Sequence, residues 1–282
     1  MLDVLSKAKN AIEAYNAQLR INSSNIANMS VPGYKTAKIS FQTIFEQVLT
    51  GGTAAESEIG GTNPIQLGSS VGIGNTYLDF SQGTLAEGLQ LDLAVNGSGL
   101  FVVSPDGGRS MLYTRAGKFL VDSAGNLVTD TGMQVYGLSG DVLVPITGLT
   151  AYNMDRLSWT KNGELVEFNL NTDGSGSLNY NDSDFNVSTG YKIALTSFTN
   201  LSGLAQSSGN TFAETAASGS PLANKTSGDI YGMAVPRNYE QSNVFYTGEV
   251  IDSMEAQRAM SGNLTILRMI SDEITNFINR IS

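Results

Sequence analysis

The two ends of the chain carry the same spacing of apolar residues. Near the carboxyl end they recur at steps of three and four, which is typical of one narrow stripe along a helix. This closing stripe consists of Met260, Leu264, Leu267, Ile270, Ile274, Phe277 and Ile281. The opening stripe keeps the same rhythm in Leu2, Leu5, Ala8, Ile12, Tyr15, Leu19 and Ile26. We therefore predict a long helix at each end.

A stripe this narrow suits the seam of a coiled coil better than the broad face of a helix on a globular core. A helix over residues 242–282 would be about 60 Å long, and it cannot bury its stripe against itself. Its partner is either the amino-terminal helix of the same chain or a helix of a neighbouring subunit. Asn22 occupies one stripe position, where it either sets the helix register or faces solvent. Gly262 costs about 1 kcal/mol relative to Ala, which suggests a close helix approach or a local bend.

The middle of the chain alternates strand-like runs with turn residues. Asn96-Gly97 lies between the apolar runs 91–95 and 100–103 and predicts a β-hairpin. Residues 124–126, Ala-Gly-Asn, predict another turn, and a second β-rich part covers 157–198. Residues 39–49 fit either a short helix or an alternating strand, and residues 51–62 have the composition of a loop.

The predicted fold class is mixed α and β. Long amino- and carboxyl-terminal helices pair as a coiled-coil-like domain, and a mainly antiparallel β domain is inserted between them. We expect the discontinuous helical domain at 1–35 and 240–282, a connecting segment at 36–90, and the β-rich domain at 91–239.

Composition removes several classes of function. The 282 residues include no His and no Cys, which excludes His-based triads, Cys nucleophiles and thiolate metal sites. The formal net charge of -10 disfavours nucleic acid as a partner, since it demands a basic surface. No long apolar run predicts membrane insertion, and the amino end lacks the pattern of a secretory signal peptide.

Three weak motifs have better structural explanations. Residues 171–182 resemble a calcium loop, but their flanks are strand-like and Asp182 stands where Glu is needed, so a Gly-rich turn is favoured. Residues 71–75 form only a partial glycine fingerprint for a dinucleotide. Asp182 and Asp184 could serve a glycosidase, but their polar, turn-rich surroundings indicate solvated loop carboxylates. No catalytic residue, metal site or cofactor is therefore predicted.

Residues 25–35 read N-I-A-N-M-S-V-P-G-Y-K. This run resembles the amino-terminal signature of the bacterial flagellar rod and hook proteins, N-N-x-A-N-x-x-T-P-G-[FY]-K, although Val31 stands where that family usually has Thr. The residues that carry this motif are Asn25, Ala27, Asn28, Pro32, Gly33, Tyr34 and Lys35.

Further matches follow in family order at residues 83–85, 91–101, 113–119 and 120–129. Near the end, S-N-V and A-Q-R-A resemble two more family elements, with Met260 in place of the usual aromatic residue. Their motif residues are Ser242, Asn243, Val244, Gln257, Arg258 and Ala259. Six motifs in the right order make the resemblance specific; it is poorest over residues 138–198.

The resemblance implies a structural subunit of the flagellar axial structure, in the basal-body rod or the hook, without enzymatic activity. Such a subunit is exported unfolded by the flagellar type III apparatus and polymerises into a hollow tube. Its partners are further copies of itself and adjacent rod or hook proteins. The two stripes are then the assembly interface, and the terminal helices are expected to gain order on assembly.

A full-sized hook protein normally has an additional outer β domain, for which 282 residues leave little room. This favours a rod subunit of the distal type, although residues 60–68 also resemble short hook proteins. The alternative from another class is a secreted β-rich adhesin or glycan-binding module with a helical oligomerisation stalk, which predicts a small closed oligomer.

Overall fold

The structure, a computed structural model, describes residues 2–50, 52, 61–63, 65–168 and 185–281. The chain divides into two compact units. The helical unit comprises Met1–Ala27, Ala37–Tyr77 and Phe245–Ser282. The head comprises Asn28–Thr36 and Leu78–Val244.

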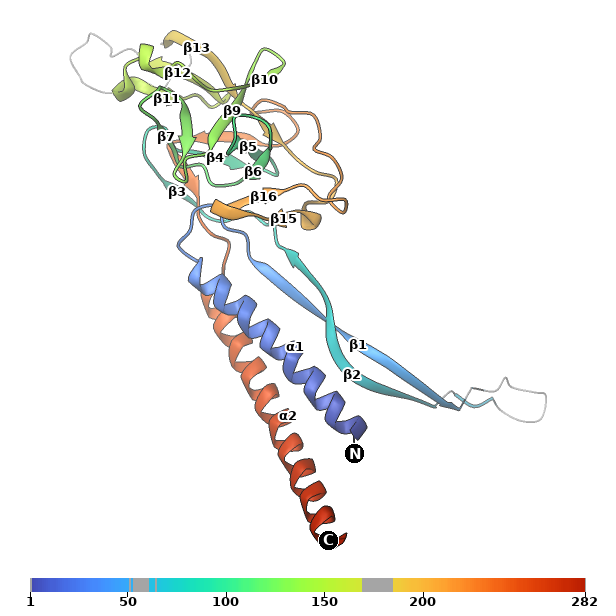
Figure 1. Cartoon of the computed structure of the whole chain (residues 1–282). Helices are drawn as coiled ribbons and strands as arrows, with labels where there is room; N and C mark the ends of the chain where they lie inside the picture. Colours follow the sequence, from blue (N-terminus) through green and yellow to red (C-terminus); the bar gives the residue numbers. More distant parts are fainter. Residues whose placement is uncertain (1, 51, 53–60, 64, 169–184, 282) are drawn as a thin grey trace. The chain divides into compact units, whose positions relative to one another are not determined.

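Two long helices and a two-stranded ribbon form the helical unit. The helices are α1 (Leu2–Ala27) and α2 (Tyr246–Ile281), and the strands are β1 (Ala37–Thr50) and β2 (Ile65–Leu78). Figure 1 shows α1 and α2 running side by side in opposite directions. The prediction of paired terminal helices around an inserted antiparallel β domain is confirmed.

Residues 39–49, which fit either a helix or a strand, belong to β1. β1 pairs only with β2, so the ribbon has no third strand among the described residues. The Phe41 ring of β1 contacts Tyr15 of α1, with ring centroids 5.6 Å apart. A two-stranded ribbon is marginally stable alone, and this contact is one place where it gains support.

The head is built from short strands in antiparallel pairs. Its largest sheet follows the order β11-β12-β13-β9-β5-β6-β16-β15, and β10, β14, β7 and β8 join it off this path. The pairs β17–β4 and β18–β3 stand apart from it. Short 3-10 helices lie at Leu149–Ala151, Met154–Arg156, Leu201–Gly203 and Ser208–Asn210. The strands are β3 (Leu85–Glu87), β4 (Leu93–Asn96), β5 (Leu100–Ser104), β6 (Leu112–Thr114), β7 (Phe119–Val121), β8 (Leu127–Thr129), β9 (Gln134–Ser139), β10 (Val142–Pro145), β11 (Leu157–Trp159), β12 (Glu164–Phe168), β13 (Phe185–Ile193), β14 (Leu195–Thr196), β15 (Ala205–Gln206), β16 (Thr211–Ala213), β17 (Met233–Pro236) and β18 (Asn238–Glu240).

The head has a core of large apolar side chains. Trp159, Phe101 and Phe119 are at most 1% exposed, and the Phe119 ring packs edge-on against both of the others. The indole N–H of Trp159 donates to the carbonyl oxygen of Leu91 (2.8 Å), so burial leaves no polar atom of that ring unpaired. The head therefore has a hydrophobic core of its own.

The prediction of a β-hairpin at Asn96-Gly97 is wrong. β4 pairs with β17, and β5 pairs with β6, β9 and β14. The N–H of Gly97 donates to the side chain of Gln82, and Gly99 donates to the carbonyl oxygen of Tyr231 (2.8 Å), so the turn is held by distant segments rather than by its flanking strands. The turn at residues 124–126 does join a hairpin, β7–β8.

Candidate assembly site at the chain ends

The two terminal helices meet through asparagine side chains of α1. The Asn25 amide donates to the Glu249 carboxylate (3.1 Å), and it also pairs with both backbone polar groups of Ala37 (2.9 and 3.0 Å). One turn earlier, the Asn22 amide hydrogen-bonds the Ser253 hydroxyl (3.2 Å) and is only 5% exposed. Asn22 therefore lies in the helix contact and can fix its register, because a buried amide needs its partner.

Burial along α2 has a heptad rhythm. Its less exposed positions recur at steps of three and four from Ser253 onward. Of the predicted stripe, Met260, Leu267, Ile270 and Ile274 are half-buried, whereas Leu264 and Phe277 are exposed. In α1 the half-buried members are Leu5, Ile12, Tyr15, Leu19 and Ile26. The side chains of Leu2 and Ile281 lie outside the described set.

The last turns of α2 extend past the start of α1, as Figure 1 shows. Counting outward from the Asn25–Glu249 contact, the first residues of α1 lie opposite the region of Ile274. Phe277 and Ile278 follow, and each is 58% exposed. The stripe of α2 is thus longer than the helix that covers it.

Small side chains make up the buried apolar set of the helical unit as far as side-chain burial is described, which is residues 4–27, 37–43, 70–77 and 245–280 of this unit. Within these ranges the apolar side chains classed as buried are Ala8, Ala14 and Ala256. Burying a methyl group contributes far less than burying a Leu or Phe side chain, which is worth about 1.5–3 kcal/mol. Helical stability in proteins comes mainly from such packing, and the large apolar stripe residues whose burial is described are at most half-buried.

Glu249, in the first turn of α2, is an ionisable group in this helix contact. Partial burial raises its pKa, Asn25 opposes this by donating a hydrogen bond to the carboxylate, Asp252 adds to the rise, and Lys38 opposes it. Partial burial of an acid at a helix contact disfavours its charged form.

Gly262 lies in the interior of α2, and nothing comes within 4 Å of the position that a Cβ atom would occupy. We expect Gly262→Ala to increase the helix content of the dilute chain, since Ala favours a helix by about 1 kcal/mol over Gly. Far-ultraviolet circular dichroism measures the change. Ser261→Ala, at the exposed neighbouring position, should give a smaller increase; a loss of helix in Gly262→Ala would contradict the open surroundings.

In the head, three charged side chains from distant parts of the sequence form a buried cluster. The Lys35 ammonium donates to Glu240 Oε1 (2.6 Å) and to the carbonyl oxygen of Ser81 (2.7 Å). The Arg115 Nε lies 3.0 Å from Glu240 Oε2. The other Arg115 nitrogens donate to the carbonyl oxygens of Gly97 and Gly99. One carboxylate thus serves two cations.

Burial makes this cluster energetically demanding. The side chains of Lys35, Arg115 and Glu240 are at most 3% exposed. Burial lowers the pKa of Lys35, and the charge of Glu240 and its hydrogen bond oppose this shift. The pKa of Arg115 is lowered by burial as well, again offset by Glu240. The cluster joins the segment after α1 to the segment before α2.

Asn243, from the S-N-V motif, makes a second junction in the head. Its Oδ1 accepts from both the N–H and the hydroxyl of Thr36 (2.8 and 2.7 Å). Its Nδ2 donates to the carbonyl oxygens of Asp79 (2.8 Å) and Ser81 (3.1 Å). All polar atoms of the amide are used, which explains in physical terms why Asn stands at this motif position.

The remaining motif residues divide by exposure. Gly33 and Tyr34 are buried in the head, and Pro32, Asn28, Ser242 and Val244 are half-buried. Ala27 at the end of α1 is exposed, and Ala259 of α2 is half-buried. Gln257 and Arg258 are exposed, and with Met254 and Ser261 they line a shallow hollow on α2.

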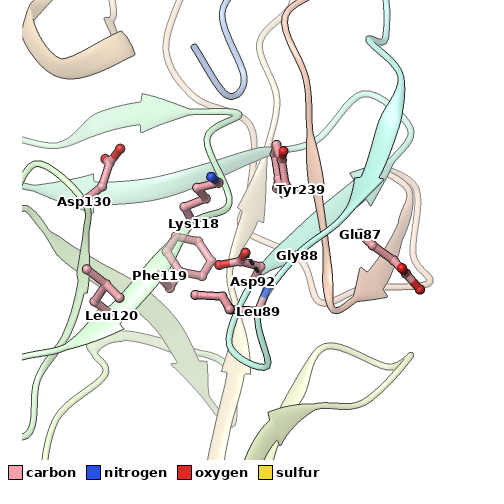
Figure 2. A pocket seen from close by; sticks show the side chains of 9 residues that line it. All are labelled: Glu87, Gly88, Leu89, Asp92, Lys118, Phe119, Leu120, Asp130 and Tyr239. Carbon is pink, nitrogen blue, oxygen red and sulfur yellow. Dashed lines mark hydrogen bonds between the residues drawn. The ribbon is translucent and has the colours of Figure 1, made fainter. Parts of the chain in front are cut away.

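The head also has a surface hollow of about 420 Å³ (Figure 2). Figure 2 shows Lys118 and Tyr239 on one side, and the Lys118 ammonium lies 4.3 Å from the centre of the Tyr239 ring. Asp92 is 3% exposed, and its carboxylate accepts the N–H of Leu89 (2.7 Å). This acid, which lies in the lining of the hollow, therefore also holds a turn.

The described residues contain no group of three or more acidic side chains placed to hold a metal. The residues of the calcium-like loop, and Asp182 and Asp184, lie outside the described residues. No described helix is both long enough and apolar enough to cross a membrane.

Sequence reasoning placed Lys35 in a motif but did not identify its partners. Arg115 belongs to the 113–119 match, and Glu240 appeared only as a domain boundary. Lys35 and Glu240, which contact each other, are 205 positions apart in the sequence. No local sequence pattern indicates such a contact. The available signal was that Lys35 and Arg115 both stand inside motifs that resemble the family.

Two family profiles match the chain. The profile described as "Flagellar hook protein FlgE/F/G D1 domain" matches residues 94–251, and the one described as "Flagella basal body rod protein" matches residues 6–35. The first covers much of the head and the start of α2, and the second covers most of α1 and the motif that follows it.

Several proteins similar to this chain are flagellar components, and some of them align with it over nearly their whole length. The flagellar basal-body rod protein FlgG of Bacillus subtilis (strain 168) is 32% identical over 277 residues, 97% of each chain. The protein of the same description in Caulobacter vibrioides is 29% identical, with 94% of each chain covered. The flagellar hook protein FlgE of Helicobacter mustelae is 34% identical over 57% of this chain, but only 36% of its own length.

Proposed function

This chain belongs to the family of flagellar rod and hook proteins, and from that premise we propose that it is a rod subunit of the distal type that polymerises through its terminal helices. As a family member it is a structural component of the flagellar axial structure. Rod rather than hook is supported by coverage: the rod relatives align over nearly their full length, whereas the hook protein of Helicobacter mustelae aligns over about a third of its own.

The observation that supports polymerisation is that the paired helices α1 and α2 bury no large apolar side chain among residues 4–27 and 246–280, whose burial the structure describes. Their buried apolar side chains there are alanines, while large apolar residues such as Phe277 and Ile278 remain exposed. Large apolar side chains that gather on an exposed surface are typical of an interaction site. Packing between copies would bury that surface at about 25 cal/mol per Å², so the helices gain their stability in the polymer.

The small size of these buried side chains fits export in an unfolded state. We propose that the flagellar type III apparatus secretes the chain before its helices pack, and that the head folds after exit. The partners of the assembled subunit are other copies of this chain and the adjacent rod or hook proteins. The predicted stripe residues of α1 and α2 are the assembly interface in this proposal.

Electron microscopy of the purified chain at high concentration tests the proposal. The control is a chain that lacks 1–27 and 245–282 but keeps Lys35 and Glu240, so that the charged cluster of the head stays complete. We expect hollow tubes from the intact chain only. Circular dichroism should show a gain in helix as the tubes form.

Phe277→Ser, at an exposed position of the stripe, should raise the concentration needed for tubes without altering the head. Tubes from the truncated chain would show that the helices are not the interface. A small closed oligomer from the intact chain, measured by sedimentation, would instead support an adhesin-like stalk and contradict polymerisation.

A further inference from the structure

Two strand pairs of the head stand apart from its large sheet. The large sheet is formed by strands β5 to β16, which span residues 100–213. Strands β3 and β4 precede this span, and they pair with β18 and β17, which follow it. We call residues 233–243, which contain β17 and β18, the clasp. The clasp contacts residues 33–36 and 79–97, which we call the base. The last segment of the head before α2 therefore completes the base.

Side chains of the clasp hold the two parts of the base together. The Glu240 carboxylate contacts the Lys35 ammonium (2.6 Å) and the Nε of Arg115 (3.0 Å). The Oδ1 of Asn243 accepts the N–H and the hydroxyl of Thr36, while its Nδ2 donates to backbone carbonyl oxygens in the other part of the base. Without the clasp, the two cations would be buried without the carboxylate that they share, which is energetically costly.

Strand β4 depends on the clasp for its backbone pairing. Its residues Leu93, Ala94 and Val95 are at most 1% exposed, and among the described strands β4 pairs with β17 alone. Buried backbone N–H and C=O groups need hydrogen-bond partners. Without β17, therefore, β4 could not stay buried as it does in the complete head.

We propose that the clasp closes the base in a separate, late step, so that the head is completed only when the chain has emerged through residue 243. A chain is synthesised from its amino end, so the clasp is the last part of the head to appear. The large sheet has all of its described strands by residue 213 and can form before that. This step belongs to the head, and it does not depend on the polymer of the proposed function.

A late clasp links the completion of the head to the appearance of α2. Helix α2 begins at Tyr246, shortly after the clasp. The N–H of Gly33 donates to the carbonyl oxygen of Glu240 (2.7 Å), so the closed base holds the segment that follows α1 beside the segment that precedes α2. A chain that ends before the clasp lacks both this junction and α2. An incomplete copy therefore cannot present a finished head.

Refolding of the full-length chain tests the order of the two steps. The chain is diluted from denaturant, and pulse-labelling hydrogen exchange is read by mass spectrometry of its peptides. Peptides that contain β9 and β12 should become protected first. Peptides that contain β3 and β4 should follow about tenfold more slowly, because their partners lie at the far end of the head sequence and such non-local pairing is slow. A prolyl isomerase in the buffer removes slow phases caused by proline isomerisation. Simultaneous protection of both groups of peptides overturns the proposal.

Variants of the clasp test whether the base opens on its own. Asn243→Ala leaves the N–H of Thr36 without its partner, and it should speed the native-state hydrogen exchange of the β3 and β4 peptides at least about tenfold. Exchange of the β9 and β12 peptides should stay within about twofold. Glu240→Gln should act in the same direction through the charged contacts of the clasp. An equal rise in both groups of peptides would show that the head opens as one unit, and it contradicts the proposal.

The matched control is Asn200→Ala. Asn200 is exposed in the same unit, and its amide donates to the carbonyl oxygen of Ala217 (3.1 Å), outside both the clasp and the base. This control should leave the exchange of both groups of peptides within about twofold of the unchanged chain. Faster exchange of β3 and β4 in the control, equal to that in Asn243→Ala, overturns the proposal. If Glu240→Gln does not fold, the refolding of the unchanged chain and the exchange of Asn243→Ala still decide the question.

Discussion

Replacing Glu240 by Gln should destabilise the head by about 3–5 kcal/mol, the range for breaking a buried ion pair by removing one partner. Gln keeps the shape of the side chain and can still accept the N–H of Gly83, which lies 2.8 Å from Oε1. What it removes is the carboxylate that contacts both cations, so Lys35 and Arg115 would stay buried without the charge that they share.

For a domain of this size, such a loss lowers the unfolding temperature by roughly 6–20 °C. The change in unfolding temperature is measured by near-ultraviolet circular dichroism, to which Trp159, the single Trp of the chain, contributes. Glu214→Gln is the matched control, because Glu214 is exposed in the same unit, and it should change stability by no more than about 0.5 kcal/mol.

A double variant keeps the test informative if Glu240→Gln unfolds completely. Lys35→Met with Glu240→Gln removes one of the two unpaired cations, so its loss should be smaller than the sum of the two single losses. Strict additivity, or an unchanged unfolding temperature in Glu240→Gln, would show that the cluster does not stabilise the head.

Gly33→Ala is expected to cost the head about 3 kcal/mol or more. Gly33 has φ +67°, in the left-handed region, where a residue with a Cβ loses about 1–2 kcal/mol. Its added Cβ would also lie 2.8 Å from the Cα of Ala116 and closer still to the peptide that joins Arg115 to Ala116. Backbone atoms cannot rotate away from a clash as a flexible side chain can, so the segment at Arg115 and Ala116 must shift away from Gly33.

Gly140→Ala separates the two causes. Gly140 has nearly the same φ, +62°, but nothing lies within 4 Å of its Cβ position. Gly140→Ala should therefore lower the free energy of unfolding only by the cost of the left-handed backbone conformation. Chemical denaturation of both variants gives the two free energies, and equal losses would mean that the close approach at Gly33 contributes nothing.

The sequence predicted the elements whose information is local. The two helices follow from stripes that repeat over several turns, and the β7–β8 hairpin follows from a turn sequence next to its own strands. The motif residues Lys35 and Asn243 were also identified, and both have defined partners in the structure.

Long-range pairing accounts for the rest. Asn96-Gly97 has the composition of a hairpin turn, but β4 finds a better partner in β17, which lies more than 130 positions away. Residues 39–49 fitted both periods, and the pairing with β2 decides for a strand. The partners of Lys35 could not be predicted, because nothing near Glu240 or Arg115 in the sequence indicates that they are buried together.

The chain leaves the head at Thr36 and re-enters it at Leu78, and these two points are adjacent. The carbonyl oxygen of Thr36 accepts the N–H of Asp79 (2.8 Å), and Lys35 reaches Ser81 across 46 positions of sequence. The segment between Thr36 and Leu78, which contains the ribbon, is therefore an insertion whose two ends are joined in the head. The entropic cost of joining the ends of such a segment grows only slowly with its length. Lengthening or shortening β1 and β2 by the same number of residues would change the length of the ribbon and keep the contacts of Thr36 and Lys35 in the head. We therefore expect the length of the ribbon to be variable without a change in the fold of the head.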